Sequence, residues 1–355
     1  MEELKYKFTE KTIEYKGYTL HQIIAISSFG DVKVGDIGGF IESEENLSQY
    51  GLCWVYDNGK VFGNAKIYDD ASVHGKAEVS ESACLRHKST VRGKSFISGE
   101  AVLCGEAIVK GEAQVSEKAT IGGESVVFGE ACVYGAAKIT GSTKISGCAN
   151  VFENADIRGG SINGCANVFG RARVEHDSYI SDHAKVYGDA YIAGNARVVD
   201  NASVHDFAEV THYAVVCGYG TVRDRACLRD MSYVTGNAIV EGDSIIGNQM
   251  LITGDAVINI DLKLNVGYGI RSKRDILVFK TWWAECVADI VWLRLGDVWI
   301  TRGYTGSTSG LLSYAYKQSR QHGDQIKEIV KYVERTNKLR CKYSWVSNLI
   351  NRFLR

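Results

Sequence analysis

The chain has 355 residues, with 41 basic and 42 acidic side chains and a formal net charge of −1. Residues 271–355 hold 16 basic and 7 acidic residues, a balance of +9, so residues 1–270 carry −10. Such dilute negative charge excludes mimicry of DNA, and no apolar run approaches the ~18 residues of a membrane-spanning helix. Proline is absent, which is typical of a parallel ladder that uses every backbone N–H group.

Residues 1–54 form the first unit and read as a β-structured N-terminal cap. The segment KYKFTEKTIEYKGYTLHQIIAI predicts strands around a turn at Lys16 and Gly17. No secretory segment precedes the charged start MEELKYKFTEK. An open β-helix end exposes unpaired backbone groups, so a cap is expected here.

Residues 55–266 form the second unit, which repeats in sixes. A branched aliphatic residue recurs at every sixth position from Val55 to Ile157 and, after one step of five, from Ile162 to Leu264. A small residue usually stands two positions before it, so both side chains face the same side of a short strand. Gly, Asn or Asp follows, and these residues tolerate the positive φ of a tight corner. Each hexad is therefore a short strand plus a corner.

Three hexads close a triangular coil of 18 residues, so the 36 hexads predict about twelve coils. At a strand spacing of ~4.8 Å these coils make a prism ~58 Å long. The sequence GCANVF occurs at Gly147 and again at Gly164, 17 residues later. One residue fewer at the corner Arg158-Gly159-Gly160 stacks the two copies directly, and the two glycines let that corner tighten.

This pattern resembles the left-handed parallel β-helix of the hexapeptide-repeat proteins, in which a small residue follows the aliphatic four positions later, as Ala77 follows Val73. Glycine falls two positions after the aliphatic here rather than one, and Met250 and Leu262 replace the small residue near the end. The segment GDIGGFIESEENLSQYGLCWVYDNGKVFGNA also resembles the start of the YdcK-like proteins of bacterial and prophage genomes. That family implies the fold and a phage-linked context but no established reaction.

Residues 267–355 form the third unit, a basic, Trp-rich α+β domain. RDILVFK and DIVWLRLGDVWITRG predict strands, the second segment being a hairpin about Gly296 and Asp297. Two helices are expected, one near residues 309–321 and one that begins at an Asp324 cap. The basic tail, with Arg340, Lys342 and Trp345, is a candidate surface for nucleic acid, an acidic protein or a membrane surface, although docking on its own domain is the plainer interpretation.

Aromatic residues recur at one corner position of successive coils. These residues are Tyr134, Phe152, Phe169, Tyr187 and His205. They predict either an intramolecular stack that steadies the helix or a binding or subunit interface, since long apolar strips are uncommon on monomers.

Cysteines raise a second question, because Cys148, Cys165 and His183 occupy one corner position in successive coils. Adjacent coils suit a disulfide, and two thiolates with an imidazole could bind zinc. Collinear ligands are unsuited to tetrahedral zinc, so we interpret the alignment as coincidental and expect no metal and no cofactor. Ten cysteines without framework spacing indicate reduced thiols and a cytoplasmic protein.

Sugar and serine acyltransferases share the hexapeptide fold, and the resemblance implies for them a histidine general base at a cleft between trimer subunits. This chain has no inserted loop within its hexads, and its outward histidines lie on different edges without a fixed acidic partner. These outward residues are His74, His87, His176, His183, His205 and His212. Fold alone does not establish a reaction.

The sequence therefore favours a non-catalytic, phage- or prophage-encoded binding or scaffold protein and assigns no catalytic residue. We expect a homo-oligomer, a trimer by analogy with the fold. The expected ligand is a host macromolecule or a small metabolite or nucleotide, bound so as to counter a host function. The alternative is a hexapeptide-family acyltransferase that acts at a trimer interface.

Overall fold

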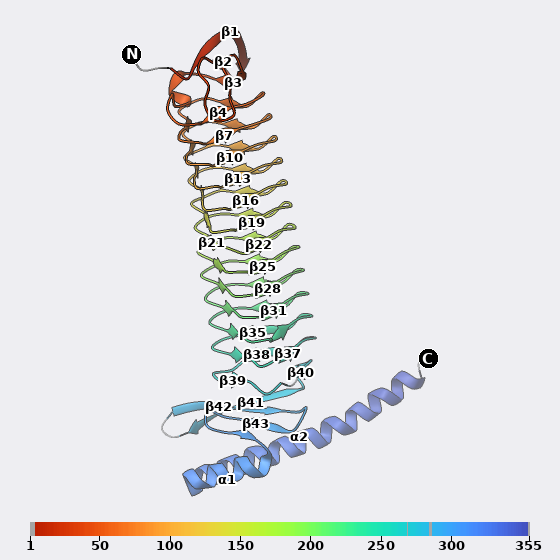
Figure 1. Cartoon of the computed structure of the whole chain (residues 1–355). Helices are drawn as coiled ribbons and strands as arrows, with labels where there is room; N and C mark the ends of the chain where they lie inside the picture. Colours follow the sequence, from red (N-terminus) through yellow and green to blue (C-terminus); the bar gives the residue numbers. More distant parts are fainter. Residues whose placement is uncertain (1–3, 268, 284–285, 354–355) are drawn as a thin grey trace.

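The computed structural model describes residues 4–267, 269–283 and 286–353, with side chains described outside residues 281–288 and 338–353. The molecule is a long three-sided rod with a β-hairpin at one end and a small sheet with two helices at the other (Figure 1). Three sheets of 15, 13 and 12 strands run along the rod, and each coil contributes one strand to each sheet. The predicted left-handed parallel β-helix fold is confirmed.

The coils are built from the hexads, and the strands are very short. Each strand from β4 (Trp54–Val55) to β39 (Lys263–Leu264) comprises the aliphatic residue of one hexad and the residue before it. Five strands extend one residue further: β18 (Lys138–Thr140), β21 (Asp156–Arg158), β24 (Arg173–Glu175), β35 (Ile239–Glu241) and β38 (Val257–Asn259). These 36 strands make the twelve predicted coils, and β40 (Gly269–Ile270) pairs with β37 (Leu251–Ile252) to continue the ladder.

The core of the rod is the predicted aliphatic series. Every one of these residues from Val55 to Leu264 has no solvent-exposed surface. The small residues two positions earlier are buried beside them, apart from the half-buried Gly160, and Met250 and Leu262 fill the same places near the C-terminal end. Because each aliphatic side chain stacks on its counterpart one coil away, burial and ladder formation reinforce each other.

The corners require positive φ, and not only glycine supplies it. Aspartate, glutamate and histidine also occupy this position, for example Asp57 (φ 54°), Glu117 (φ 59°) and His176 (φ 60°). The acidic side chains are suited to it because their carboxylates accept hydrogen bonds from the corner amides of the next coil. Glu117 accepts from the Gly135 amide at 3.1 Å, and Asp57 accepts from the Gly75 amide at 2.9 Å.

The shortened coil behaves as the sequence predicts. Asn150 pairs with Asn167 and Val151 with Val168, so the two GCANVF copies stack directly. The corner that loses a residue turns through Gly159 (φ 106°) and Gly160 (φ 80°). A Cβ atom on Gly160 would lie 2.5 Å from the Ser178 carbonyl oxygen, so only glycine fits there.

The N-terminal cap converts an antiparallel hairpin into the parallel ladder. Strands β1 (Tyr6–Tyr15) and β2 (Tyr18–Ala25) form the predicted hairpin about Lys16 and Gly17, both at positive φ. Strand β2 pairs antiparallel with β3 (Ile37–Ile41), and β3 pairs parallel with β5 (Lys60–Val61). A short 3₁₀ helix, η1 (Glu44–Asn46), then leads into the first coil.

A four-stranded antiparallel sheet closes the other end of the rod. Its strands run in the order β41 (Ile276–Trp283), β42 (Cys286–Leu293), β43 (Val298–Ile300) and β44 (Thr305–Gly306). The predicted hairpin about Gly296 and Asp297 joins β42 to β43. One face of the sheet continues the core of the coils through Ile276, Val291, Leu293 and Ile300.

The opposite face of this sheet packs on the two helices, α1 (Thr308–Gln318) and α2 (Arg320–Phe353). Trp292 and Trp299 lie here against Leu311, Ala315 and Ile326. The predicted Asp324 cap is wrong, because α2 begins at Arg320. The Ser319 hydroxyl accepts from the His322 amide at 3.1 Å and so caps the helix five residues before Asp324. The Asp324 carboxylate instead accepts from the Tyr316 hydroxyl at 2.9 Å.

Helix α2 is much longer than α1, and its C-terminal part projects away from the rod (Figure 1). Over the residues that the structure describes, neither helix has the length and apolar character needed to cross a membrane.

Candidate functional site

The aromatic residues predicted from the repeat form a continuous stack, which we call the ladder. Its members are Tyr134, Phe152, Phe169, Tyr187 and His205. Successive ring centroids are 4.9, 4.8, 4.9 and 4.7 Å apart, with interplanar angles of 3°, 4°, 3° and 12°. All five side chains are half-buried. The predicted alignment is therefore present, with the rings stacked face to face and their edges directed outward.

The ladder follows from strand register. Each ring comes directly after the last residue of a strand in the 15-stranded sheet, from β17 (Cys132–Val133) to β29 (Ser203–Val204). Parallel pairing places equivalent residues of adjacent coils one strand spacing apart, which is close to the distance of aromatic stacking. Each such pair is worth about 0.5–1.5 kcal/mol beyond area burial, so the stack contributes to the stability of the coils.

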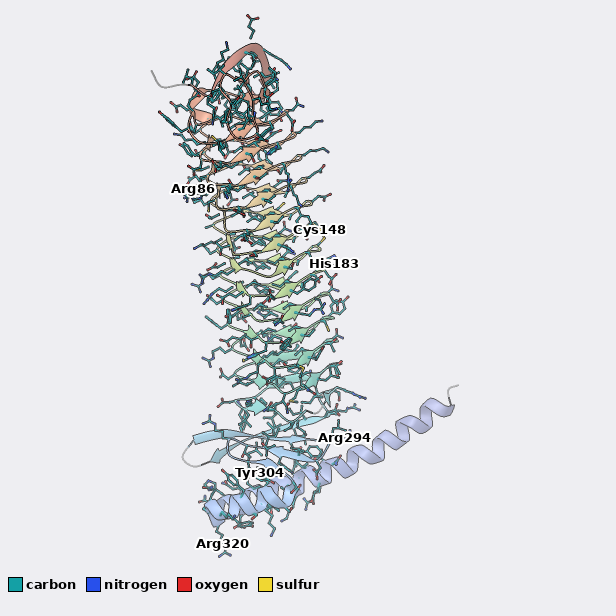
Figure 2. The ribbon with its side chains drawn as sticks, in the orientation of Figure 1. Arg86, Cys148, His183, Arg294, Tyr304 and Arg320 are labelled. Atoms are coloured by element: carbon teal, nitrogen blue, oxygen red, sulfur yellow. A yellow bond between two sulfur atoms is a disulfide. The ribbon has the colours of Figure 1, made fainter. Side chains whose placement is uncertain are left out.

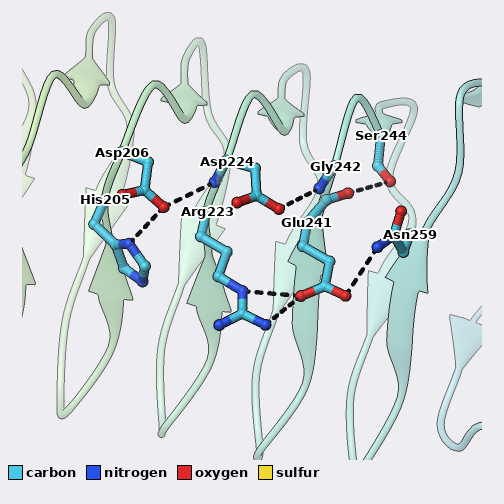
Figure 3. Close-up of polar contacts among 8 residues, drawn as sticks. All are labelled: His205, Asp206, Arg223, Asp224, Glu241, Gly242, Ser244 and Asn259. Atoms are coloured by element: carbon cyan, nitrogen blue, oxygen red, sulfur yellow. Dashed lines mark hydrogen bonds and ion pairs between the residues drawn. The ribbon is translucent and has the colours of Figure 1, made fainter.

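Beyond His205 the same corner position becomes polar, which the sequence analysis missed (Figure 3). Arg223 and Glu241 follow at intervals of 18 residues, and Asn259 comes next. The Arg223 Nε donates to Glu241 Oε2 at 2.8 Å, its Nη2 donates to the same oxygen, and Asn259 Nδ2 donates to Oε1 at 3.0 Å. The Arg223 hydrogen bond holds the pKa of Glu241 below its usual value. The 18-residue spacing was the signal that would have identified these residues.

His205 marks the junction between the aromatic and polar parts. Its Nδ1 lies 3.0 Å from Asp206 Oδ2, and the same oxygen accepts from the Asp224 amide at 3.3 Å (Figure 3). The imidazole is only 15% exposed, whereas the Asp206 side chain is 48% exposed. A carboxylate on Nδ1 orients the ring and would leave Nε2 as the proton-accepting nitrogen. We expected no fixed acidic partner for any of the outward histidines, and that expectation is wrong for His205.

Two open grooves lie on the same edge of the rod as the ladder. One, of about 660 Å³, includes Glu81, Glu100, Glu117, Lys118 and Glu153 in its lining. The other, of about 600 Å³, is lined by Asp206, Phe207, Asp224, Arg225, Gly242 and Asp243. In the first groove three carboxylates accept hydrogen bonds from corner amides, so much of its negative charge is already engaged. We call the ladder with these two grooves the ladder edge.

The aligned cysteines lie on a different edge. Cys148 and Cys165 form a disulfide across adjacent coils, with Cα atoms 4.7 Å apart, and exposed His183 occupies the next place along that corner (Figure 2). Our interpretation of the cysteine alignment as coincidental is wrong, as is the expectation that all thiols are reduced. Neither disulfide sulfur is a free thiolate, and the described residues contain no group of three or more His, Cys, Asp and Glu side chains arranged to hold a metal ion.

The remaining predicted residues are distributed as follows. His87, His176 and His212 occupy corners at positive φ on another edge. His74 stacks on Tyr56 at 4.1 Å near the cap, and burial lowers the pKa of its imidazole. Arg340, Lys342 and Trp345 lie outside the residues whose side chains the structure describes.

Comparison with known proteins adds one relative. No family model matches the chain. Over 46 residues the chain is 50% identical to YdcK of Escherichia coli K12, whose name describes it as an uncharacterized acetyltransferase. The match covers 13% of this chain and 14% of YdcK. With the repeat and the β-helix described above, this match confirms the predicted resemblance to YdcK-like hexapeptide-repeat β-helix proteins.

Proposed function

We propose that the chain is a binding scaffold and that the ladder edge is the surface on which its partner binds. The observation that carries this proposal is the unbroken row of five stacked rings, which continues into Arg223, Glu241 and Asn259 along one straight edge. A rigid rod keeps these side chains in place before binding, so little conformational entropy is lost on association.

The chemistry of the edge supports a macromolecular partner. The faces of the middle rings are covered by their neighbours, so a partner meets their edges, with Phe207 (61% exposed) beside them. Aromatic residues next to an arginine–carboxylate pair are typical of interface centres that carry most of the binding energy. The partner is either a second copy of this chain, as the expected trimer requires, or a different protein.

The test is a double substitution, Phe152→Ser with Phe169→Ser. The matched control is Tyr213→Ser with Tyr219→Ser, which removes two aromatic side chains (61% and 65% exposed) from the corners of the other two edges. Circular dichroism checks the fold, light scattering measures the mass, and mass spectrometry identifies proteins and small molecules that co-purify.

We expect the ladder variant to remain folded but to have a smaller mass or to lose its partner, because truncating a buried aromatic anchor costs more than about 2 kcal/mol. The control variant should behave like the wild type. Equal mass and equal co-purification in the wild type and the ladder variant would restrict the ladder to a structural role and overturn the proposal.

A second candidate is an acetyltransferase, which the match to YdcK and the contact between His205 and Asp206 both favour. In this function, His205 Nε2 would take a proton from an acceptor hydroxyl or amine, which then attacks the thioester carbon of acetyl-CoA and releases the CoA thiol. The acceptor would lie in the groove that includes Asp206, Phe207 and Arg225. The low exposure of the imidazole is the reason that binding is our first proposal.

One variant separates the two candidates. His205→Phe keeps an aromatic ring in the stack but removes both ring nitrogens, so it should preserve binding and abolish catalysis. Release of CoA thiol from acetyl-CoA is measured with amino sugars or serine as acceptors, and His176→Phe is the control on another edge. Thiol release by the wild type that is lost only in His205→Phe would establish the enzyme, and its absence from the wild type with these acceptors would leave binding as the function.

The phage origin, the host partner, the cytoplasmic location and contact with nucleic acid through the C-terminal domain stay predictions. The domain has a structural role in any case, since its sheet closes the core of the rod. A deletion of the basic tail after residue 337 therefore tests nucleic-acid binding without removing the buried residues of the sheet and the first turns of α2.

A further inference from the structure

A buried lysine and a buried cysteine touch each other where the N-terminal cap meets the first coil. Lys5 Nζ lies 3.2 Å from Cys53 Sγ. Lys5 is 4% exposed and Cys53 is fully buried. This pair is far along the rod from the ladder, and neither proposed function uses it.

The surrounding groups aim the amine at the sulfur. Nζ donates to the Cys53 carbonyl at 2.8 Å and points toward the Tyr50 carbonyl at 3.5 Å, while the Phe29 ring lies 5.0 Å away. The Lys5 amide donates to Gln49 Oε1 at 2.8 Å, which fixes the backbone. Among the described residues no carboxylate forms an ion pair with Lys5, so the thiol is the reactive group within its reach.

The buried setting favours the neutral forms of both groups. Burial lowers the pKa of the Lys5 amine and raises the pKa of the Cys53 thiol. A neutral amine has a free lone pair and can form a covalent bond, which an ammonium cannot. Cysteine sulfur is the side-chain atom most readily oxidised, and oxidised sulfur condenses with nearby nucleophiles, nitrogen included.

We propose that Lys5 and Cys53 are the two ends of an oxidative cross-link, an Nζ–O–Sγ bridge formed with dioxygen. One oxygen atom of O₂ becomes the bridge, and the other leaves as water with one N–H hydrogen and the S–H hydrogen. The nitrogen and the sulfur each lose two electrons, and O₂ gains four. A thiol reductant reverses the link by returning electrons to the bridge.

The link would join the start of the cap to the first coil. Lys5 immediately precedes β1, and Cys53 immediately precedes β4 (Trp54–Val55). The segment between them contains the whole hairpin and β3, so the bridge would close a loop around the cap. Cross-linking such a loop lowers the entropy of the unfolded chain and should raise the thermal midpoint of the cap.

Peptide mapping tests the proposal. The full chain is purified in air or under nitrogen with reductant and is digested with trypsin, which does not cleave after a modified lysine. In the air sample we expect residues 1–7 joined to residues 34–60, with a mass equal to the sum of the two peptides plus one oxygen atom minus two hydrogen atoms. The linked species should be absent under nitrogen and disappear on reduction.

Three variants control the assignment. Lys5→Arg and Cys53→Ser should abolish the linked species, whereas Cys132→Ser, at a half-buried thiol that contacts the Glu130 carbonyl, should keep it. Should Cys53→Ser fail to fold, the wild-type map still decides. Cleavage after Lys5 together with a free Cys53 thiol in the air sample overturns the proposal, and a linked pair without the added oxygen overturns the N–O–S assignment.

Discussion

Phe152 and Phe169 stack with ring centroids 4.8 Å apart and an interplanar angle of 4°, although 17 residues rather than 18 separate them. The missing residue is absorbed at the Gly159-Gly160 corner, so the strands on either side keep their register. The continuity of the ladder therefore depends on a corner on another edge of the rod.

The first prediction concerns that corner. Gly160→Ala places a Cβ atom 2.5 Å from the Ser178 carbonyl oxygen at a φ of +80°. Gly17→Ala is the matched control, because Gly17 has a similar φ of +85° and open space around it. We expect the control to lose about 1–2 kcal/mol from positive φ alone and Gly160→Ala to lose at least about 3 kcal/mol. Chemical denaturation measures both, and equal losses would contradict the steric explanation.

A second prediction concerns the core. Val151→Asp and Ile180→Asp each bury a carboxylate where both side chains have no exposed surface, and desolvation without a partner costs several kcal/mol. Neither variant should yield soluble folded protein. Lys185→Asp adds the same side chain at an exposed strand position and should remain soluble. A normal thermal midpoint for either core variant would be incompatible with the assigned interior.

The third prediction concerns the Arg223–Glu241 pair and acid. The hydrogen bond from Arg223 lowers the pKa of Glu241 in the folded chain. The pair therefore stabilises the fold fully at pH values above 4.5, the ordinary pKa of glutamate. That stabilisation is lost as the pH falls through the lower pKa that Glu241 has in the folded chain. Glu241→Gln should therefore flatten the fall of the thermal midpoint below about pH 4.5.

Arg223→Gln should also flatten the fall of the thermal midpoint at low pH. The double variant should show no larger effect than either single variant, because both substitutions remove the same interaction. Melting curves between about pH 3 and about pH 7, which span the titration of a carboxylate, provide the measurement. Additive effects of the two substitutions would show that the residues act independently.

The fourth prediction concerns the disulfide. Cys148 and Cys165 close a loop of 17 residues, for which chain entropy predicts a stabilisation of about 3 kcal/mol. In Lys5→Arg, which lacks the proposed bridge, reductant should lower the thermal midpoint, and adding Cys148→Ser with Cys165→Ser should lower it as much without any further response to reductant. A reductant effect that persists when both disulfide cysteines and Lys5 are replaced would contradict this assignment.

The β-helix was predictable because one interaction repeats. Residues such as Val151 and Ile162 could be assigned to the interior from spacing alone, since in a coil the same neighbours recur at every turn. The ladder followed from the same spacing. Its polar continuation through Arg223 and Glu241 obeys the same spacing but was not predicted, because spacing alone does not show which polar side chains pair across coils.

Features that depend on single contacts were harder to predict. The bond between Cys148 and Cys165 required side-chain geometry that spacing does not specify. The start of α2 depends on one hydroxyl, that of Ser319, in competition with Asp324. Contact between Lys5 and Cys53 involves a lysine that belongs to no repeat, so no periodicity could indicate it.

The carboxylates at the corners give the negative charge of the β-helix a structural explanation. Glu81, Glu117 and Glu153 each occupy a positive-φ corner and bind the corner amide of the following coil. Negative charge on this edge thus serves the backbone and does not by itself signal a basic ligand. A cation or basic peptide that approached the groove would have to compete with the amides for the same oxygen atoms, so selection for a stable corner and selection for such a ligand would oppose each other.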